Sequence, residues 1–126
     1  MSTVPTHAVV WFEIPVTDLA KSTAFYQAIT QHEMVQTEMG GQAMSIFPTT
    51  DPATGVSGNL VEGKPAGEGA GPTLHLVCKG KLEDTIQRVW DAGGRVVSPE
   101  VVIPEGRFAY CLDLDGNSIS IFEANS

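Results

Sequence analysis

Glu13 and His75 are the residues whose types and positions offer the clearest chemistry. Each lies in an apolar, alternating segment, two residues after Trp11 and Thr73 respectively. Side chains two apart on a strand share one face, so the alternation pairs Glu13 with Trp11 and His75 with Thr73. Where a fold brings a carboxylate and an imidazole together, they can act as a general base and its partner, or as a two-ligand metal site.

Each of these side chains also has a structural interpretation. His75 could be a half-buried histidine that makes one hydrogen bond. Glu13 could hold a backbone amide or pair with Arg107. The sequence leaves these alternatives open.

Aromatic residues accompany the two polar groups in the same segments. Alternation places Phe108 and Tyr110 on one strand face, where they could line an apolar pocket together with Trp11 and Phe122. Aromatic residues of this kind are more often part of a core. No glycine-rich phosphate loop, nucleophile elbow or Cys-x-x-Cys pair occurs in the sequence.

Composition excludes several classes of protein. The 126 residues carry a formal net charge of −8, with 15 acidic and seven basic residues and no basic cluster, which argues against binding nucleic acid. No apolar run approaches the roughly 20 residues of a membrane span, and the first residues do not resemble a signal peptide. We therefore expect a cytoplasmic protein of one domain with no membrane partner. Cys78 and Cys111 lie in apolar alternating segments, as expected for buried free thiols.

The first half of the chain is predicted to contain one helix and four strands. His7 to Val16 is rich in β-branched and aromatic residues and predicts a strand. Asp18 is a predicted N-cap for a helix from Leu19 to about Thr30. Three further strands are expected at 34–39, 43–47 and 59–62, with a tight Gly40-Gly41 turn and a loop over 48–58.

The second half repeats this order. A strand over 73–78 precedes a helix over 81–92, whose Leu82, Ile86, Val89 and Trp90 have helical spacing, and Gly93 is its predicted end. Strands are expected at 95–97, 108–112 and 118–122, with a loop over 99–106. Asp115-Gly116 predicts a hairpin between the last two strands.

The two halves therefore predict an α+β fold of two tandem βαβββ modules whose mixed sheets form a cup. The modules span residues 7–62 and 73–126 of a single domain, 1–126. Residues 63–72 are rich in glycine and proline and form the expected linker.

Three motifs resemble the vicinal oxygen chelate superfamily, which includes glyoxalases, bleomycin-resistance proteins and extradiol dioxygenases. They are EIPVTDLAKSTAFY at 13–26, WDAGGRVV at 90–97 and GRFAYCLDLDGNSISIFE at 106–123. Their order and spacing match a small glyoxalase-like member over nearly the whole chain. Leu114 replaces the proline that is common in the closing hairpin.

The resemblance implies a divalent metal in the cup, acting as a Lewis acid on a substrate with vicinal oxygens. The ligand positions fall on Trp11, on Thr73 or its neighbour, on Ser120, and on Asn59, Val61 or Glu62 in the short strand. Tryptophan, threonine and serine do not supply the carboxylate or imidazole groups that such cations prefer. A divalent metal is possible, but its usual ligand positions are not occupied.

Two functions follow as hypotheses. One is an enzyme, a glyoxalase-like lyase, isomerase or dioxygenase. The family register implies that Glu13 and His75 converge on the cup from paired central strands, where they are catalytic or hold a metal at an atypical site. The other is a metal-free module that binds a small organic molecule, such as an antibiotic, in a cup lined by Trp11, Thr73, Phe108, Tyr110 and Ser120. The resemblance also implies a homodimer, with cups formed within one chain or across two.

Overall fold

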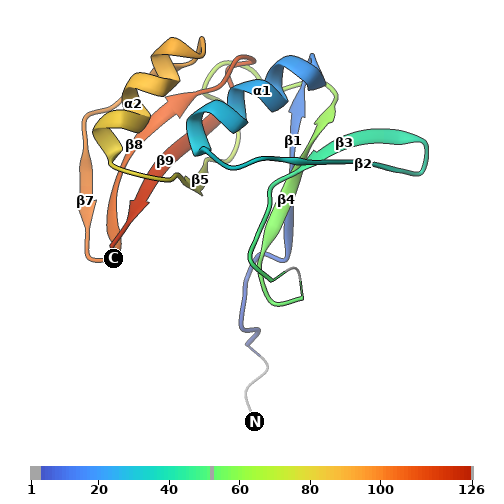
Figure 1. The fold of residues 1–126 in the computed structure, drawn as a ribbon, viewed down its shortest axis with the longest axis horizontal. Coiled ribbons are helices and arrows are strands. Elements are labelled where there is room, and N and C mark those ends of the chain that lie inside the picture. Colours follow the sequence, from blue (N-terminus) through green and yellow to red (C-terminus); the bar gives the residue numbers. More distant parts are fainter. Residues whose placement is uncertain (1–3, 52, 126) are drawn as a thin grey trace.

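The protein folds into two helices and nine strands within residues 4–51 and 53–125, which a computed structural model describes (Figure 1). The first half contains β1 (Trp11–Val16), α1 (Leu19–Thr30), β2 (Val35–Met39), β3 (Gln42–Ile46) and β4 (Ser57–Glu62). The second half contains β5 (Leu74–Val77), α2 (Leu82–Asp91), β6 (Arg95–Val96), β7 (Val101–Ile103), β8 (Gly106–Leu112) and β9 (Ser118–Ala124).

The strands form two mixed sheets with the same topology. The first sheet has the order β1-β4-β3-β2, and the second has the order β5-β9-β8-β6, with β7 also paired to β8. In each sheet the first strand of the half runs parallel to the last, and the other pairs are antiparallel. This arrangement confirms the predicted α+β fold with a repeated βαβββ order.

Several predicted boundaries were wrong. β1 begins at Trp11 rather than His7, because its partner β4 begins directly opposite at Ser57. β4 is correspondingly longer than the predicted 59–62. The predicted loop over 99–106 contains β7, whose β-branched residues Val101 to Ile103 pair with the first half of β8. β6 and β7 together occupy the place that β2 holds in the first sheet.

The predicted start of α1 is confirmed. The Asp18 carboxylate accepts a hydrogen bond from the Lys21 backbone N–H at 3.1 Å. α2 begins differently, because Lys81 makes no side-chain cap and the Leu82 N–H instead donates to Glu123 of β9 at 2.8 Å. Trp90, predicted on the apolar stripe of α2, is 50% exposed. It lies about 100° around the helix from buried Val89, beyond the buried stripe.

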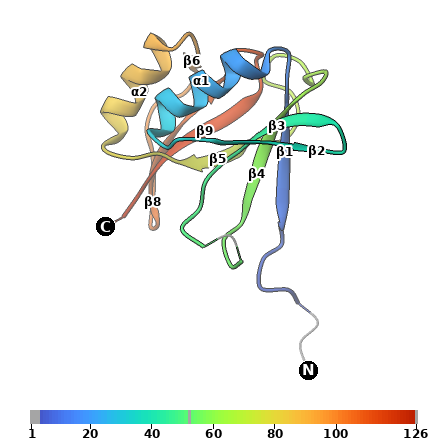
Figure 2. The same cartoon turned by 45° about the vertical axis from the view of Figure 1, so that its right-hand side comes forward.

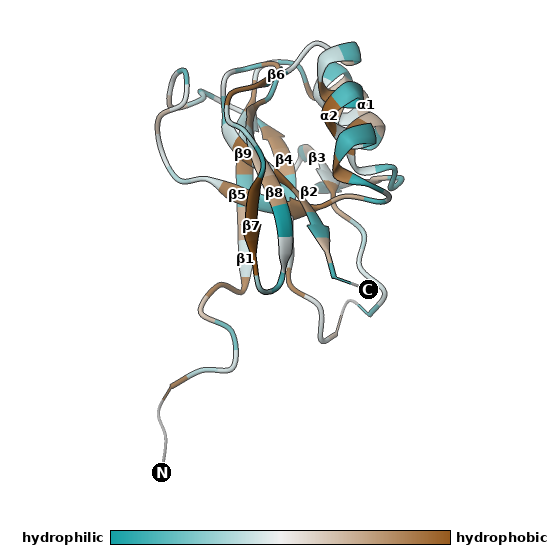
Figure 3. Ribbon diagram, turned by 90° about the vertical axis from the view of Figure 1, so that its left-hand side faces the viewer, coloured by the Kyte–Doolittle hydropathy of each residue, from teal (hydrophilic) through white to brown (hydrophobic). Residues whose placement is uncertain are grey.

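The two halves share one hydrophobic core. Both helices lie to one side of the strands, and α1 packs against α2 (Figures 2 and 3). The core therefore combines the helix-facing residues of both sheets with the inner faces of both helices: Ile14, Val16, Leu60, Leu76, Cys78, Ala109, Cys111, Ile119, Ile121, Phe25, Tyr26, Ile29, Leu82 and Val89. Neither α1 nor α2, the helices of the described residues, is long and apolar enough to cross a membrane.

The paired glycines after α2 have separate roles. Gly93 adopts a φ of +97°, a left-handed conformation that favours glycine at the end of a helix. Gly94 lies so close to α1 that an added Cβ would come within 2.7 Å of the Phe25 ring. The predicted helix end is thus also a contact between the two halves.

Candidate functional site

Each sheet has one face turned to the helices and one face turned away from them. The register places Trp11 and Glu13 of β1 with Asn59 of β4 on the open face of the first sheet. It places His75 of β5 with Ser120 of β9 and Tyr110 of β8 on the open face of the second sheet. The predicted pairing of Glu13 with Trp11 on one face is therefore confirmed.

The open face of the second sheet carries a cluster of four rings. The His75 ring centroid lies 4.8 Å from that of Phe108 and 5.8 Å from that of Tyr110, in edge-to-face geometry. Phe108 also contacts Tyr110 at 5.3 Å and stacks on Phe122 at 6.0 Å. Phe108 is buried, whereas Tyr110 and His75 are exposed. We call His75, Phe108, Tyr110 and Phe122 the aromatic cluster.

Hydroxyl groups lie beside this cluster. The Ser120 Oγ is 2.6 Å from His75 Nδ1, and Ser120 itself is fully buried. Thr73 and Ser118 share a hydrogen bond of 2.5 Å between their hydroxyls at the start of β5 and β9. The predicted site residues Thr73, His75, Phe108, Tyr110 and Ser120 therefore all lie in the second sheet or immediately before it.

The open face of the first sheet carries an anchored tryptophan. Trp11 is 45% exposed, and its Nε1–H donates to Asn59 Oδ1 at 2.7 Å. Indole nitrogen can only donate, so this bond fixes the orientation of the Asn59 amide. Asn59 Nδ2 is then buried with no hydrogen-bond partner among the described residues. Sequence reasoning did not foresee this pair, because the register of β1 on β4 brings the two residues together.

Glu13 and His75 do not meet within the chain. β1 and β5 belong to different sheets and are not paired with each other, which corrects the prediction of paired central strands. Each strand pairs instead with the last strand of its own half, β4 or β9. No hydrogen bond, ion pair or ring contact joins Glu13 to His75 in residues 4–51 and 53–125. Arg107, one of the alternative partners considered for Glu13, binds Glu83, Glu100 and Glu123 instead, because it points to the helix side of the second sheet.

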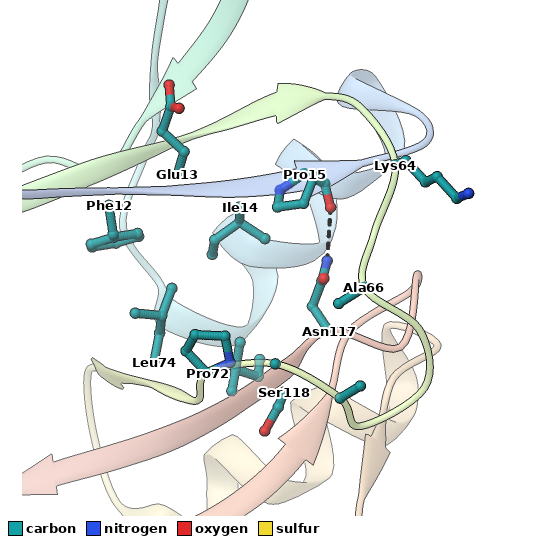
Figure 4. A pocket seen from close by; sticks show the side chains of 13 residues that line it. Phe12, Glu13, Ile14, Pro15, Lys64, Ala66, Pro72, Leu74, Asn117 and Ser118 are labelled. Carbon is teal, nitrogen blue, oxygen red and sulfur yellow. Dashed lines mark hydrogen bonds between the residues drawn. The ribbon is translucent and has the colours of Figure 1, made fainter.

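A pocket of about 330 Å³ lies between β1 and the start of β5, where the two halves meet. Figure 4 shows Phe12 and Ile14 pointing from β1 toward Leu74 and Pro72, while Glu13 points away from them. Two of the lining residues are bonded to each other, because Asn117 Nδ2 donates to the Pro15 carbonyl at 2.9 Å. Its lining combines inner-face residues such as Phe12, Ile14 and Leu74 with Glu13 and Ser118 of the open faces and with residues of the linker.

The donor groups of the chain do not fit the metal implied by the resemblance. Trp11 occupies one ligand position, and Ser120 occupies another with its buried hydroxyl already bonded to His75. Among the described residues no group of three or more His, Cys, Asp or Glu side chains could hold an ion. Glu13 and His75, proposed as a relocated pair of ligands, are on separate sheets. We therefore derive no step through a metal.

The residues whose side-chain pKa is shifted lie away from both open faces. Burial raises the pKa of Cys78 and of Cys111 to about 12, so both are core thiols, as predicted. Burial, reinforced by neighbouring Asp113, raises the pKa of Tyr26 well above its usual value. Hydrogen bonds from Arg107 lower the pKa of Glu83 to about 2. These groups hold the fold together.

Comparison with known proteins agrees with the geometry. Residues 8–40 match the family described as bleomycin resistance protein-like, N-terminal. No curated protein matches the chain in sequence. Three similar solved structures are a glyoxalase/bleomycin resistance protein from Albidiferax ferrireducens, the fosfomycin resistance protein FosX from Listeria monocytogenes, and TnmS3, an antibiotic binding protein from a Streptomyces species.

These structures share the whole fold at low sequence identity. The first is 18% identical over 94% of this chain and 100% of its own, with a TM-score of 0.65. FosX is 20% identical over 98% and 96%, with a TM-score of 0.64. TnmS3 is 22% identical over 97% and 99%, with a TM-score of 0.65. The chain thus has the glyoxalase/bleomycin-resistance fold. This confirms the fold that the resemblance to the vicinal oxygen chelate superfamily implied.

Proposed function

We propose that the protein is a metal-free binding module that takes up a small, flat organic molecule at its open sheet faces. The observation that carries this proposal is the aromatic cluster, in which Tyr110 is 37% exposed and His75 is also exposed. Solvent-exposed aromatic rings held rigidly on strands provide a stacking surface with little entropy to lose on binding. The antibiotic-binding and fosfomycin-resistance proteins among the structural neighbours support a small-molecule ligand.

Trp11 supplies a second aromatic surface in this proposal. Its ring stays half exposed while Asn59 holds the indole nitrogen. Glu13 on the same face and Thr73 beside the second sheet provide polar contacts at the edges of the site. Ser120 contributes indirectly, through its bond to His75.

We further propose that a homodimer completes the cup, with the open face of the first sheet in one copy opposite that of the second sheet in the other. Trp11 and His75 lie on different sheets, so a second copy offers a way to bring them onto one ligand. Val35 and Met39 of β2 and Val77 of β5 are 53%, 66% and 57% exposed on these faces. These exposed apolar side chains would be covered in such a dimer. The two free, buried cysteines are compatible with a cytoplasmic location.

A catalytic version of this site would use Glu13 and His75 on a bound substrate, from opposite sides of the dimer cup. It predicts that a bound compound is recovered chemically changed, and that Glu13→Gln keeps binding but stops the conversion. The binding proposal predicts recovery of the intact compound. Mass spectrometry of the compound after incubation separates the two.

The test uses Trp11 as the reporter. In a Trp90→Phe background, which removes the other tryptophan, we expect flat aromatic compounds to quench Trp11 emission saturably. Light scattering should give the mass of a dimer. Tyr110→Ala should weaken binding by roughly fivefold, since an aromatic contact contributes on the order of 1 kcal/mol. Val102→Ala, 72% exposed on the helix-facing side of the second sheet, is the matched control.

Metal dependence is tested on the same protein. Purified without chelator, it should carry no stoichiometric metal, and added Ni²⁺, Zn²⁺, Mn²⁺ or Fe²⁺ should not raise its melting temperature. A stoichiometric metal that is lost in Glu13→Gln or His75→Phe would overturn the metal-free proposal. Failure of a broad panel of aromatic compounds to bind would overturn the binding proposal itself.

A further inference from the structure

One hydrogen bond on the open face of the second sheet determines what His75 can offer a ligand. Ser120 and His75 are register partners on the parallel strands β9 and β5. The Ser120 Oγ and His75 Nδ1 are 2.6 Å apart. Ser120 has no exposed surface, whereas His75 is exposed.

The burial of Ser120 decides which atom donates. In residues 4–51 and 53–125 the Ser120 hydroxyl has no hydrogen-bond partner other than His75 Nδ1. If Nδ1 carried the proton, the serine O–H would be buried with no acceptor, which is unfavourable. If Ser120 donates, its proton and the Nδ1 lone pair are both satisfied. A neutral imidazole carries one N–H, so the proton then lies on Nε2.

Nε2 is the ring nitrogen that does not bond the buried serine, and His75 is exposed on the open face of the sheet. Phe108 and Tyr110 contact the ring at interplanar angles of 88° and 67°. These contacts restrict the ring without consuming its second nitrogen, because neither aromatic residue provides an in-plane acceptor there. The described residues make no hydrogen bond to Nε2.

We propose that Ser120 is a positioning residue that holds His75 in the neutral Nε2–H tautomer, and that the site therefore selects flat aromatic ligands bearing a carbonyl oxygen. This inference rests on the proposed binding function and narrows its ligand class. A carbonyl oxygen in the ring plane accepts from Nε2–H while the rest of the ligand stacks on Tyr110. In the Nε2–H tautomer, His75 is a hydrogen-bond donor through Nε2. It therefore does not serve as a base or a metal ligand through that nitrogen.

The first experiment measures the tautomer. Long-range ¹H–¹⁵N correlation spectra of protein labelled at histidine separate the two neutral tautomers by the nitrogen shifts. We expect the Nε2–H form for His75 in the wild type and a mixture in Ser120→Ala. Ser118→Ala, two residues along the same strand face, should leave the His75 tautomer unchanged. A wild-type Nδ1–H form, or the same tautomer in Ser120→Ala, would overturn the inference.

The second experiment measures selection with a matched pair of probes, 1-indanone and indane, which differ by one carbonyl oxygen. Chemical-shift titration should give roughly fivefold tighter binding of 1-indanone, as one hydrogen bond of on the order of 1 kcal/mol implies. His75→Phe keeps an aromatic ring at an exposed position and should abolish the preference for 1-indanone over indane. This variant also keeps the test valid if Ser120→Ala folds poorly.

The outcomes separate the two proposals. Equal affinity of the wild type for both probes would overturn the inference while leaving the proposed binding function intact. Binding of neither probe would count against the proposed function, and the tautomer measurement would still decide the role of Ser120. A preference for 1-indanone that persists in His75→Phe would assign the carbonyl contact to another group and overturn the inference.

Discussion

The hydroxyl of Tyr26 donates a 2.6 Å hydrogen bond to the Asp113 carboxylate and thereby joins α1 of the first half to the β8–β9 hairpin of the second. Tyr26 is fully buried, and Asp113 is 5% exposed. Asp113 also accepts hydrogen bonds from the backbone of Asp115 and Asn117, so it shapes its own turn. The predicted hairpin is therefore also one of the points at which the two halves are bonded together.

Removing this hydroxyl should destabilise the whole domain. Tyr26→Phe keeps the ring packed against Phe25 and Phe47, whose centroids lie 5.1 and 5.5 Å away. It leaves a buried carboxylate short of one donor, which should lower the free energy of unfolding by about 1–3 kcal/mol. Urea denaturation measures the change. In an Asp113→Asn background the same substitution should cost less, and equal losses in both backgrounds would show that the hydroxyl acts elsewhere.

Acid stability should depend on the ion pair between Arg107 and Glu83. Arg107 donates to both Glu83 carboxylate oxygens, at 2.6 and 2.8 Å, and these bonds lower the pKa of Glu83 from its usual 4.5 to about 2. Because the folded-state pKa lies below the usual value, the pair stabilises the folded state above pH 4.5. This contribution is lost as the pH falls from 4.5 toward 2.

Glu83→Gln should therefore show a shallower loss of stability over that acid range than the wild type. At neutral pH its effect should be small, since the Glu83 side chain is 65% exposed and solvent screens the pair. Thermal melts across the acid range measure both effects. Glu105→Gln removes an exposed carboxylate that makes no side-chain bond in the described residues, and it should follow the wild-type curve. A Glu83→Gln curve parallel to that of the wild type would refute the linkage.

Both cysteines should be unreactive in the folded protein. Burial raises the pKa of the Cys78 and Cys111 thiols to about 12, and the thiolate is the reactive form. A disulfide-exchange reagent at mildly alkaline pH should label them only as fast as the protein unfolds. Ala20→Cys on the exposed side of α1 is the positive control. Rapid labelling of the native wild type would mean that the core opens without global unfolding.

The sequence predicted those features that depend on local pattern. Alternation placed Glu13 beside Trp11, Asp18 predicted the start of α1, and Asp115-Gly116 predicted the final turn. Each of these signals lies within a few residues of the feature that it predicts. The same signals placed the start of β1 too early and predicted a loop where β7 lies. Where a strand begins and ends depends on where its partner begins and ends, and local signals do not contain this information.

The contacts that define the site depend on register between strands far apart in sequence. Ser120 is 45 residues from His75, and Asn59 is 48 residues from Trp11. A shift of one residue in either pairing would turn the partner to the other face of its sheet. The partners of Arg107 were also unforeseen, because they come from α2, from β9 and from the segment before β7. Local pattern carries no information about such pairings.

Asn59 should be replaceable without loss of stability, although it is almost fully buried. Its Nδ2 lacks a partner, so the native amide already carries the cost of an unsatisfied donor. Asn59→Val removes that donor and suits a strand, and Trp11 can bond water instead because it is 45% exposed. We expect the free energy of unfolding to change by less than about 1 kcal/mol or to rise. Without the hydrogen bond to Asn59, the Trp11 side chain should rotate faster. Time-resolved fluorescence anisotropy of Asn59→Val in a Trp90→Phe background measures this.

Asn117→Val is the matched control for this substitution. The Asn117 Nδ2 donates to both the Pro15 carbonyl and the Asp113 carboxylate at 2.9 Å, so the same change breaks two satisfied bonds. It should lower stability by about 1–3 kcal/mol while leaving Trp11 motion unchanged. Equal destabilisation by the two substitutions would mean that the Asn59 amide is satisfied in solution. An unchanged anisotropy in Asn59→Val would mean that packing, rather than the bond to Asn59, holds the indole in place for a ligand.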